Sequence, residues 1–357
     1  MRRTSETPRA GTAETFFDAH CDAVMKSIDE GADFQSTASP AHISLPRLLS
    51  ANVRVQAFAC CVVYPDRPSE AYAERGWAMV EAIAAMAAES GGRMAVARTA
   101  ADLERSFLGG PISAVIGLEG ADPLEGHAEN LRGFADHGVR QLIFAWKDNA
   151  FCGTAFGSDA PLSREGDRLL GLSEELRVMV DVSHLSDRAF DGVCERSSRP
   201  FIASHSNCRA VCPHPRNLTD AMIRRLADRG GVMGINLAPH FLDPAYSAAW
   251  VSARRGAVPH PMSPAERAEL AAERSSIPAP GLDAVVTHVL HAMQVGGEDV
   301  VGLGGDLDGI ERLPVGIETV ADYPKLVPLF RAAGLSDRQI DKVCHGNFRR
   351  VFAEVLP

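Results

Sequence analysis

The chain has 357 residues, of which 46% are hydrophobic and 23% charged, a composition typical of folded globular proteins and unlike that of disordered or collagen-like chains. Acidic residues outnumber basic ones by 46 to 36, so the formal net charge is -10, the wrong sign for a nucleic-acid-binding surface. Apolar runs such as 53–63 are shorter than the ~20 residues that cross a bilayer, and residues 1–14 lack the apolar core of a signal peptide. We therefore expect a cytoplasmic protein that binds neither nucleic acid nor membranes.

The cysteines do not form a recognisable framework. All 8 are scattered along the chain, without a CxxC pair and without the close spacing found in small disulfide-rich domains. We expect reduced thiols.

Short runs rich in apolar, β-branched and aromatic residues predict eight strands. These runs lie at 15–23, 53–63, 112–120, 139–146, 178–184, 200–206, 231–237 and 300–307. Helical spacing of apolar residues between them, as in 70–90, predicts helices, and three residues stand where they could cap a helix: Ser186, Thr219 and Ser336. The alternation favours a single (β/α)8 barrel spanning 1–357; an open doubly wound sheet would compete, but no Gly-rich dinucleotide fingerprint follows the first strand.

Two segments interrupt this alternation. Residues 24–52 should include a short helix, and residues 238–280 form a proline-rich insertion around one helical run at 263–276. Because long connections in barrels are often functional, we interpret 238–280 as a lid or specificity loop; a surface elaboration or subunit contact explains it equally well.

Polar side chains stand at the ends of most predicted strands, where a buried strand should be apolar unless function intervenes. They are His20, Asp22, Glu119, His184, His205 and Asp306. All lie at carboxyl ends, the face on which barrel enzymes assemble their active sites. His20 and Asp22 are two residues apart and so leave an extended strand on the same side, although such a pair alone is more often structural.

Imidazole and carboxylate ligands suit Zn²⁺, and this set is larger than one tetrahedral ion needs. We therefore predict two metal ions bridged by Glu119: one also bound by His20 and Asp22, the other by His184 and His205. A water shared by the ions would become a hydroxide nucleophile near neutral pH, and Asp306 would serve as the general base and then the general acid.

The motifs FDAHCD, GLEG, VDVSH, ASHSNCRAVCPHPRN and GLGGDLDG, in this order, resemble those of the membrane (renal) dipeptidase family of binuclear zinc peptidases. The likeness runs from about residue 15 to residue 355. It implies a zinc-dependent (β/α)8 barrel of the metallo-dependent hydrolase type that cleaves dipeptides, including substrates with a C-terminal D-residue. Carried over by position, it implies the same metal ligands and catalytic aspartate, and it places the arginine that binds the substrate carboxylate at Arg216.

Two positions depart from mammalian members of that family. Trp146 stands where they have a histidine that contacts the tetrahedral intermediate, so this contact is lost, moved to Lys147 or Asn149, or left to the metal. Ala238 replaces a tyrosine near the substrate. These departures put the substrate range in doubt rather than the reaction, and we expect Trp146, Asn149 and Asn236 to lie at the substrate.

The leading hypothesis is thus a dipeptidase with two Zn²⁺ per chain, with a homodimer as one assembly to consider. A second hypothesis keeps the metals and changes the substrate to an N-acyl amino acid, a lactone or an ester. A third, of another class, is a non-catalytic binding barrel, which the complete set of ligands disfavours.

Overall fold

A computed structural model describes residues 14–63, 71–254 and 264–357. Residues 1–14, for which we predict no signal peptide, lie almost wholly outside the described ranges. Residues 255–263 of the proline-rich insertion also lie outside them.

Eight parallel strands close into a barrel, in the order β1-β2-β4-β5-β6-β7-β8-β9 with β9 pairing back to β1. A ninth strand, β3, pairs with the first half of β4 outside this ring. The strands are β1 Phe16–Cys21, β2 Val53–Cys61, β3 Met94–Val96, β4 Ile112–Glu119, β5 Val139–Ile143, β6 Met179–Asp181, β7 Ile202–Ala203, β8 Val232–Ile235 and β9 Val301–Leu303. The predicted barrel and its eight strands are confirmed; β3 was missed because three residues are too few to show a periodic pattern.

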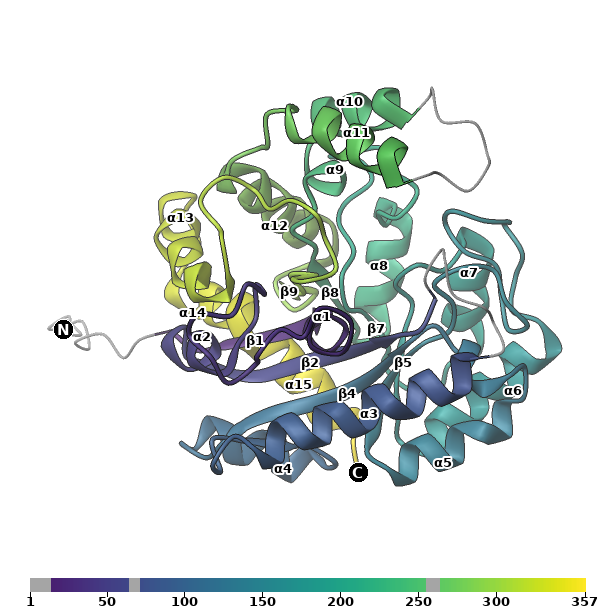
Figure 1. Ribbon diagram of the computed structural model, residues 1–357. Coiled ribbons are helices and arrows are strands. Elements are labelled where there is room, and N and C mark those ends of the chain that lie inside the picture. The colour runs from purple at the N-terminus through teal and green to yellow at the C-terminus, as the bar shows by residue number, and fades with distance from the viewer. Residues whose placement is uncertain (1–13, 64–70, 255–263) are drawn as a thin grey trace, which may run out of the picture.

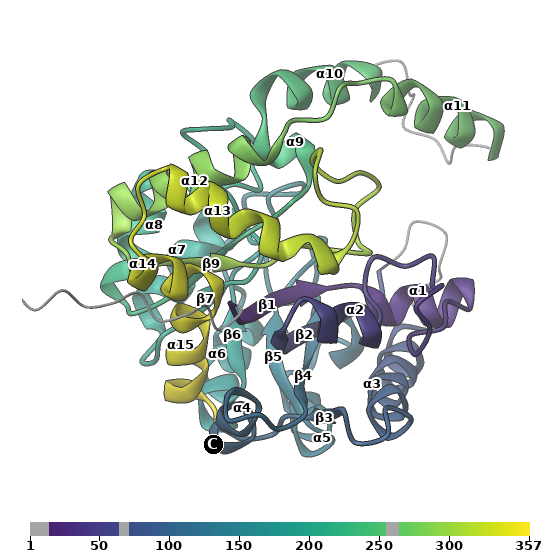
Figure 2. The ribbon, with the colours of Figure 1, turned by 90° about the vertical axis from the view of Figure 1, so that its left-hand side faces the viewer.

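Helices surround the barrel (Figures 1 and 2). They are α1 Ala23–Glu30, α2 Leu45–Ser50, α3 Tyr72–Ala88, α4 Ala100–Phe107, α5 Leu131–Asp136, α6 Arg164–Glu175, α7 Asp187–Arg196, α8 Asp220–Asp228, α9 Pro239–Leu242, α10 Pro244–Arg254, α11 Pro264–Ser275, α12 Leu282–Gly296, α13 Leu326–Ala332, α14 Asp337–Asp341 and α15 Asn347–Val355. The three predicted caps are confirmed, because each hydroxyl accepts a hydrogen bond from a backbone N–H in the first turn of α7, α8 or α14. Residues 24–52 hold two short helices instead of one.

The hydrophobic core consists of two clusters of buried residues. A large apolar cluster lies between strands and helices, and a smaller one, which includes Phe17, Val115 and Ile202, fills the barrel interior. The interior cluster continues into α15, where the rings of Phe348 and Phe352 lie 5.5 and 5.0 Å from that of Phe17. Helix α15 thus closes the amino-terminal end of the barrel and leaves the carboxyl ends of the strands for chemistry.

A bulge in β1 decides where His20 points. Asp18 pairs with Gln56 and Cys21 with Phe58, so three steps along β1 match two along β2. In a regular strand His20 would face away from the side of Phe17 and Ala19, which belong to the interior cluster. The extra residue turns His20 into the barrel as well, a use of bulges that is common beside active sites.

The insertion holds three helices, α9 to α11, where the sequence predicted one (Figure 2). Its start is fixed to the barrel, because Asn217 Nδ2 donates to the carbonyl of Phe241 and His288 Nε2 donates to that of Leu242, each at 2.9 Å. Its far end is tied to the segment after β9, because the Arg312 guanidinium donates to the carbonyl of Ile277. The single-helix prediction failed because proline-rich flanks hid the short α9 and the apolar α10.

Candidate metal and active site

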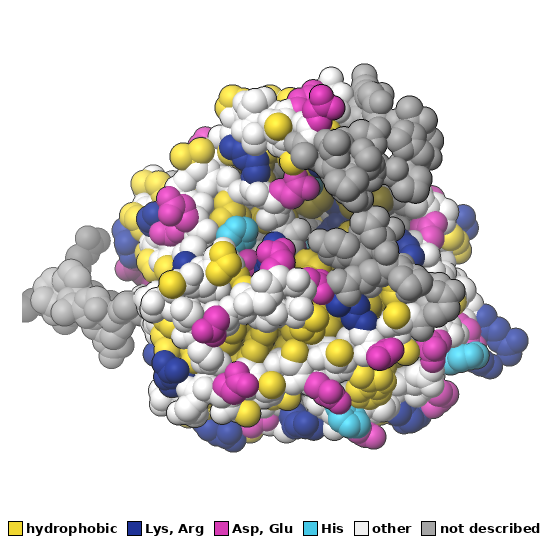
Figure 3. Space-filling view, viewed as in Figure 1, with side chains coloured by type: hydrophobic (Ala, Val, Ile, Leu, Met, Phe, Trp, Pro, Cys, Tyr) yellow, Lys and Arg dark blue, Asp and Glu magenta, His cyan; other side chains and the backbone are white. Residues whose placement is uncertain are grey.

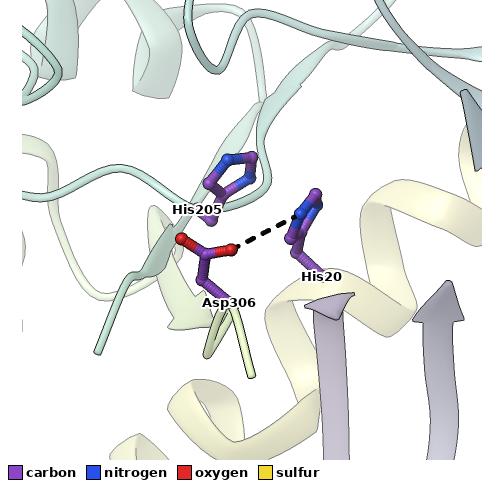
Figure 4. Close-up of side chains that lie close together, drawn as sticks. All are labelled: His20, His205 and Asp306. Carbon is purple, nitrogen blue, oxygen red and sulfur yellow. Dashed lines mark ion pairs between the residues drawn. The ribbon is translucent and has the colours of Figure 1, made fainter. Parts of the chain in front are cut away.

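The six predicted polar side chains converge at the carboxyl ends of β1, β4, β6, β7 and β9. Three of them, His20, His205 and Asp306, face one another in Figure 4, where the dashed line joins His20 Nε2 and Asp306 Oδ1, 3.7 Å apart. His20 Nε2 also lies 3.5 Å from Asp22 Oδ2, and the rings of His20 and His205 are 3.8 Å apart. Asp22 is the N-cap residue of α1, but its side chain makes no capping hydrogen bond, so its carboxylate is available to interact with the cluster.

Glu119 lies between two groups of these side chains, and each of its oxygens faces one group. Oε2 is 3.6 Å from His20 Nε2. Oε1 is 3.0 Å from His184 Nε2 and 3.6 Å from His205 Nε2. Since Glu119 is only 3% exposed, both groups are shielded from bulk water. Among the described residues, two sets of ligand atoms that share Glu119 are each within reach of a single ion: His20, Asp22 and Glu119, and Glu119, His184 and His205. A third set, of His20, His205 and Asp306, lies between them.

In the first group, His20, Asp22 and Glu119, the charge of each side chain shifts the pKa values of the others. Burial disfavours the imidazolium of His20, but the carboxylates of Glu119 and Asp22 outweigh it and raise the pKa of His20 well above its ordinary value. Burial raises the pKa of Asp22, and the Glu119 charge raises it further. Burial also acts to raise the pKa of Glu119, yet His20 and His184 hold that pKa well below its usual range. A positive charge beside Glu119, on His20 or on a bound ion, therefore stabilises its buried carboxylate.

The second group favours neutral imidazoles. Burial, assisted by the charge of Arg216, lowers the pKa of His184 to about 4. Burial and His20 hold the pKa of His205 well below its ordinary value. The Ser204 hydroxyl lies 2.8 Å from His205 Nδ1, which orients the ring so that Nε2 faces Glu119. Neutral imidazole is the form that binds metals, and a hydrogen bond to the second ring nitrogen is the usual support for such a ligand.

Asp306 follows β9 in a constrained turn. Its φ of 58° lies in the left-handed region that non-glycine residues rarely adopt, and its N–H donates to the carbonyl of His20 at 3.2 Å. Burial raises the pKa of its carboxyl, although His20 acts to lower it. A strained, only partly exposed carboxyl with a raised pKa at the mouth of a barrel has the properties of a general acid or base.

Arg216 lies beside this cluster, on the segment after β7. Its side chain is buried, and its two terminal nitrogens donate long hydrogen bonds, of 3.4 Å to Ser206 Oγ and 3.3 Å to the carbonyl of His205. Its Nε finds no hydrogen-bond acceptor among the described residues. Burial lowers the pKa of Arg216 to about 10, so the group stays charged at neutral pH. A buried guanidinium with weak bonds and a free donor is ready for an anionic ligand.

The other substrate candidates differ in their surroundings. The partly exposed Trp146 ring lies 6.0 Å from the ring of His184, at the edge of the cluster. The Asn149 amide donates to Asp122, in the segment after β4, and to the carbonyl of Phe144 at the start of its own loop. Lys147 donates to the Tyr72 hydroxyl. These contacts indicate a structural role for Asn149 and give neither residue a bond toward the cluster.

Three further residues beside the cluster carried no sequence signal. Cys61 pairs in register with Glu119 across β2 and β4, so both side chains face the barrel interior. Ser204 orients His205, and Asn207 holds the backbone of Asn236 through two hydrogen bonds. Register between predicted strands, had it been known, would have placed Cys61; the other two contacts depend on loop geometry.

The model of the membrane dipeptidase family, peptidase family M19, matches residues 9–356. The chain belongs to this family. The crystal structure of dipeptidase AC, a metallopeptidase of family M19, is 26% identical, covers 97% of this chain and 99% of that one, and superposes with a TM-score of 0.82. A metallopeptidase from Rhodobacter sphaeroides, solved with a phosphinate mimic of the dipeptide L-Ala-D-Ala, is 25% identical with a TM-score of 0.82, covering 96% of this chain and 100% of that one. An uncharacterised Klebsiella pneumoniae protein in the pqqA 5′ region is 31% identical over 287 residues, which are 78% of this chain and 95% of that relative.

As a membrane dipeptidase family member, the chain is a metal-dependent hydrolase that acts on the peptide bond of dipeptides. Within the described ranges, no helix is both long enough and apolar enough to span a bilayer.

Proposed function

We propose that this dipeptidase works with two zinc ions bridged by Glu119. The observation that carries the proposal is the division of the Glu119 oxygens, Oε2 facing His20 and Oε1 facing His184 and His205. One carboxylate shared by two ligand groups is the arrangement that a two-metal hydrolase requires.

The residues fit such a pair of ions. Imidazole nitrogens and carboxylate oxygens in buried positions are the ligands that Zn²⁺ prefers, and His20 Nε2 has no hydrogen-bond partner among the described residues. The Nε2 atoms of His184 and His205 lie only 2.9 Å apart beside one carboxylate oxygen, and a cation between them would satisfy all three atoms. When bound, the ions would polarise the peptide carbonyl and lower the pKa of the attacking water.

Asp306 and Arg216 supply the remaining chemistry. Asp306 Oδ1 faces the cluster, so it can take a proton from the attacking water and deliver it to the nitrogen of the breaking C–N bond. The products are then a free carboxylate and a free amine. Arg216 would hold the substrate carboxylate, because its guanidinium lies against the carbonyl of the ligand His205 and is therefore close to the metal ligands. A short distance between the carboxylate site and the metal ligands is what a dipeptide substrate requires.

The insertion contributes a wall beside Arg216. The Phe241 ring of α9 lies 5.6 Å from the guanidinium carbon, and the hydrogen bonds from Asn217 and His288 keep α9 in place. Beyond α9, the Trp250 ring of α10 stacks between His240 and the Arg274 guanidinium. Figure 3 shows charged side chains and a histidine among apolar ones on the face below the insertion. We therefore propose that 238–280 acts as a lid whose inner edge is fixed.

The test is a kinetic screen of L,L and L,D dipeptides with zinc supplied, repeated on Asp306→Asn. General acid–base catalysis contributes about 10²–10⁴-fold, so kcat should fall by that factor while the shape of the site is kept. A fully active Asp306→Asn variant would contradict the mechanism.

The same screen addresses the alternatives. Faster turnover of N-acyl amino acids, lactones or esters than of any dipeptide would favour the second hypothesis. Fewer than one tightly held divalent ion per chain, without turnover, would favour a binding barrel. A cytoplasmic location and a homodimer stay predictions.

A further inference from the structure

The contacts of Asn236 link it to Asp306. Asn236 follows β8, is fully buried, and its Nδ2 donates a 2.8 Å hydrogen bond to Asp306 Oδ2. The other oxygen of that carboxyl, Oδ1, is the one that faces His20. The two oxygens of Asp306 therefore have different surroundings, one bound to an amide inside the protein and one turned to the cluster.

The orientation of the Asn236 amide is fixed by its neighbours. Its Oδ1 accepts the N–H of Ala238 at 2.7 Å, so the NH₂ group must be on the side of Asp306. Its backbone is held by Asn207, whose Oδ1 accepts the N–H of Asn236 at 2.9 Å and whose Nδ2 donates to its carbonyl at 3.0 Å. The Oδ1 of Asn236 and one N–H of its Nδ2 are thus bonded inside the protein, to Ala238 and Asp306, and these bonds direct the amide to the catalytic carboxylate.

The backbone of Asp306 is held separately. The N–H of Gly305 donates to Asp18 Oδ1 at 2.9 Å, and the N–H of Asp306 donates to the His20 carbonyl. With the main chain fixed, the remaining freedom of Asp306 is rotation of its side chain, and the bond from Asn236 removes it.

We propose that Asn236 is a positioning residue for the reaction, holding Asp306 so that Oδ1 alone exchanges protons with water and the leaving amine. The inference rests on the proposed function, in which Asp306 is the proton carrier. Because the Asn236 amide acts through its bond to Asp306, its loss should change kcat and leave KM and metal content unchanged.

The test compares Asn236→Ala with wild-type enzyme and with Asn347→Ala, each zinc-loaded and full-length. Asn347 is a matched control, because it is also buried and donates two hydrogen bonds, to the carbonyls of Glu298 and Val301, at the opposite end of β9. A hydrogen bond to a charged group supports a fall in kcat of about 10–100-fold for Asn236→Ala, with KM within about twofold. Asn347→Ala should lose thermal stability and keep kcat.

Two further measurements separate positioning from general damage. Asn236→Asp keeps an acceptor for the Ala238 N–H while replacing the donor that faces Asp306, so it should fold and lose kcat by at least tenfold. In an Asp306→Ala background, followed by product accumulation over long incubations, adding Asn236→Ala should cost no more than twofold. Unchanged kcat in Asn236→Ala or Asn236→Asp, or equal losses in both backgrounds, overturns the inference. A wild-type enzyme without dipeptidase activity overturns the proposed function instead.

Discussion

Replacing Arg216 by Met should remove the recognition of the substrate carboxylate. The guanidinium is buried, charged and short of acceptors, with one nitrogen unpaired among the described residues and its two hydrogen bonds at 3.3 and 3.4 Å. A substrate carboxylate would accept two charge-assisted hydrogen bonds from it, at about 1.5–3 kcal/mol each. Losing both should cost ~3–5 kcal/mol, which lowers kcat/KM by about 10²–10⁴-fold.

The assay is a thermodynamic cycle in which both the enzyme and the substrate are changed. Wild type and Arg216→Met are each measured on a dipeptide and on the same dipeptide with its carboxylate converted to an amide. Because Arg216 also contacts Ser206 and the backbone of His205, the variant will disturb the site, but this disturbance acts on both substrates and cancels in the comparison. Wild type should prefer the free acid by at least 10²-fold and the variant by less than threefold. A variant that keeps the full preference would refute the carboxylate role.

Other changes test the metal centre, the insertion and the fold. Glu119→Gln should lower kcat by at least 10²-fold and reduce bound zinc to one ion or fewer, measured by elemental analysis; two retained ions would contradict bridging. Burial lowers the pKa of His288 to about 4 in the folded protein. Between pH ~6.5 and about 4 the unfolded chain therefore protonates this histidine and the folded protein does not, so the free energy of unfolding decreases as the pH is lowered through this range. This residue should cost ~2 kcal/mol at pH 5 relative to pH 7, and in His288→Gln that part of the pH dependence, measured by denaturant unfolding, should disappear. Phe352 of α15 packs against Phe17 of β1, so Phe352→Ala should lower the free energy of unfolding by ~3–5 kcal/mol. The metal content of the folded variant at low temperature should stay normal. A loss under about 1 kcal/mol would contradict the packing role of Phe352.

The barrel was predictable because its determinants are local. A run such as 112–120 is apolar over the length of one strand. Ser186 and Thr219 each indicate the start of a helix, because a capping side chain bonds to a backbone N–H within the next four residues. The metal candidates were predictable for a related reason, since an unpaired imidazole or carboxylate at the end of a buried strand is costly, and such residues recur at the ends of several strands.

What the sequence could not predict depends on contacts between distant segments. The bulge that turns His20 inward is a mismatch between β1 and β2, and the three-residue β3 is defined by its pairing with β4. Asn236 was expected at the substrate, yet its amide bonds to Ala238 and Asp306, a contact with a residue 70 positions away. Asn149 lies in the right loop, but its hydrogen bonds hold the loop itself.

The account depends most on the shared position of Glu119 between two cations. Anomalous diffraction from crystals of the zinc-loaded enzyme, collected above and below the zinc absorption edge, tests this directly. The account predicts two peaks per chain, one near His20 and Asp22 and one near His184 and His205, with a carboxylate oxygen of Glu119 ligating each. A single peak, or a second peak away from Glu119, would contradict it.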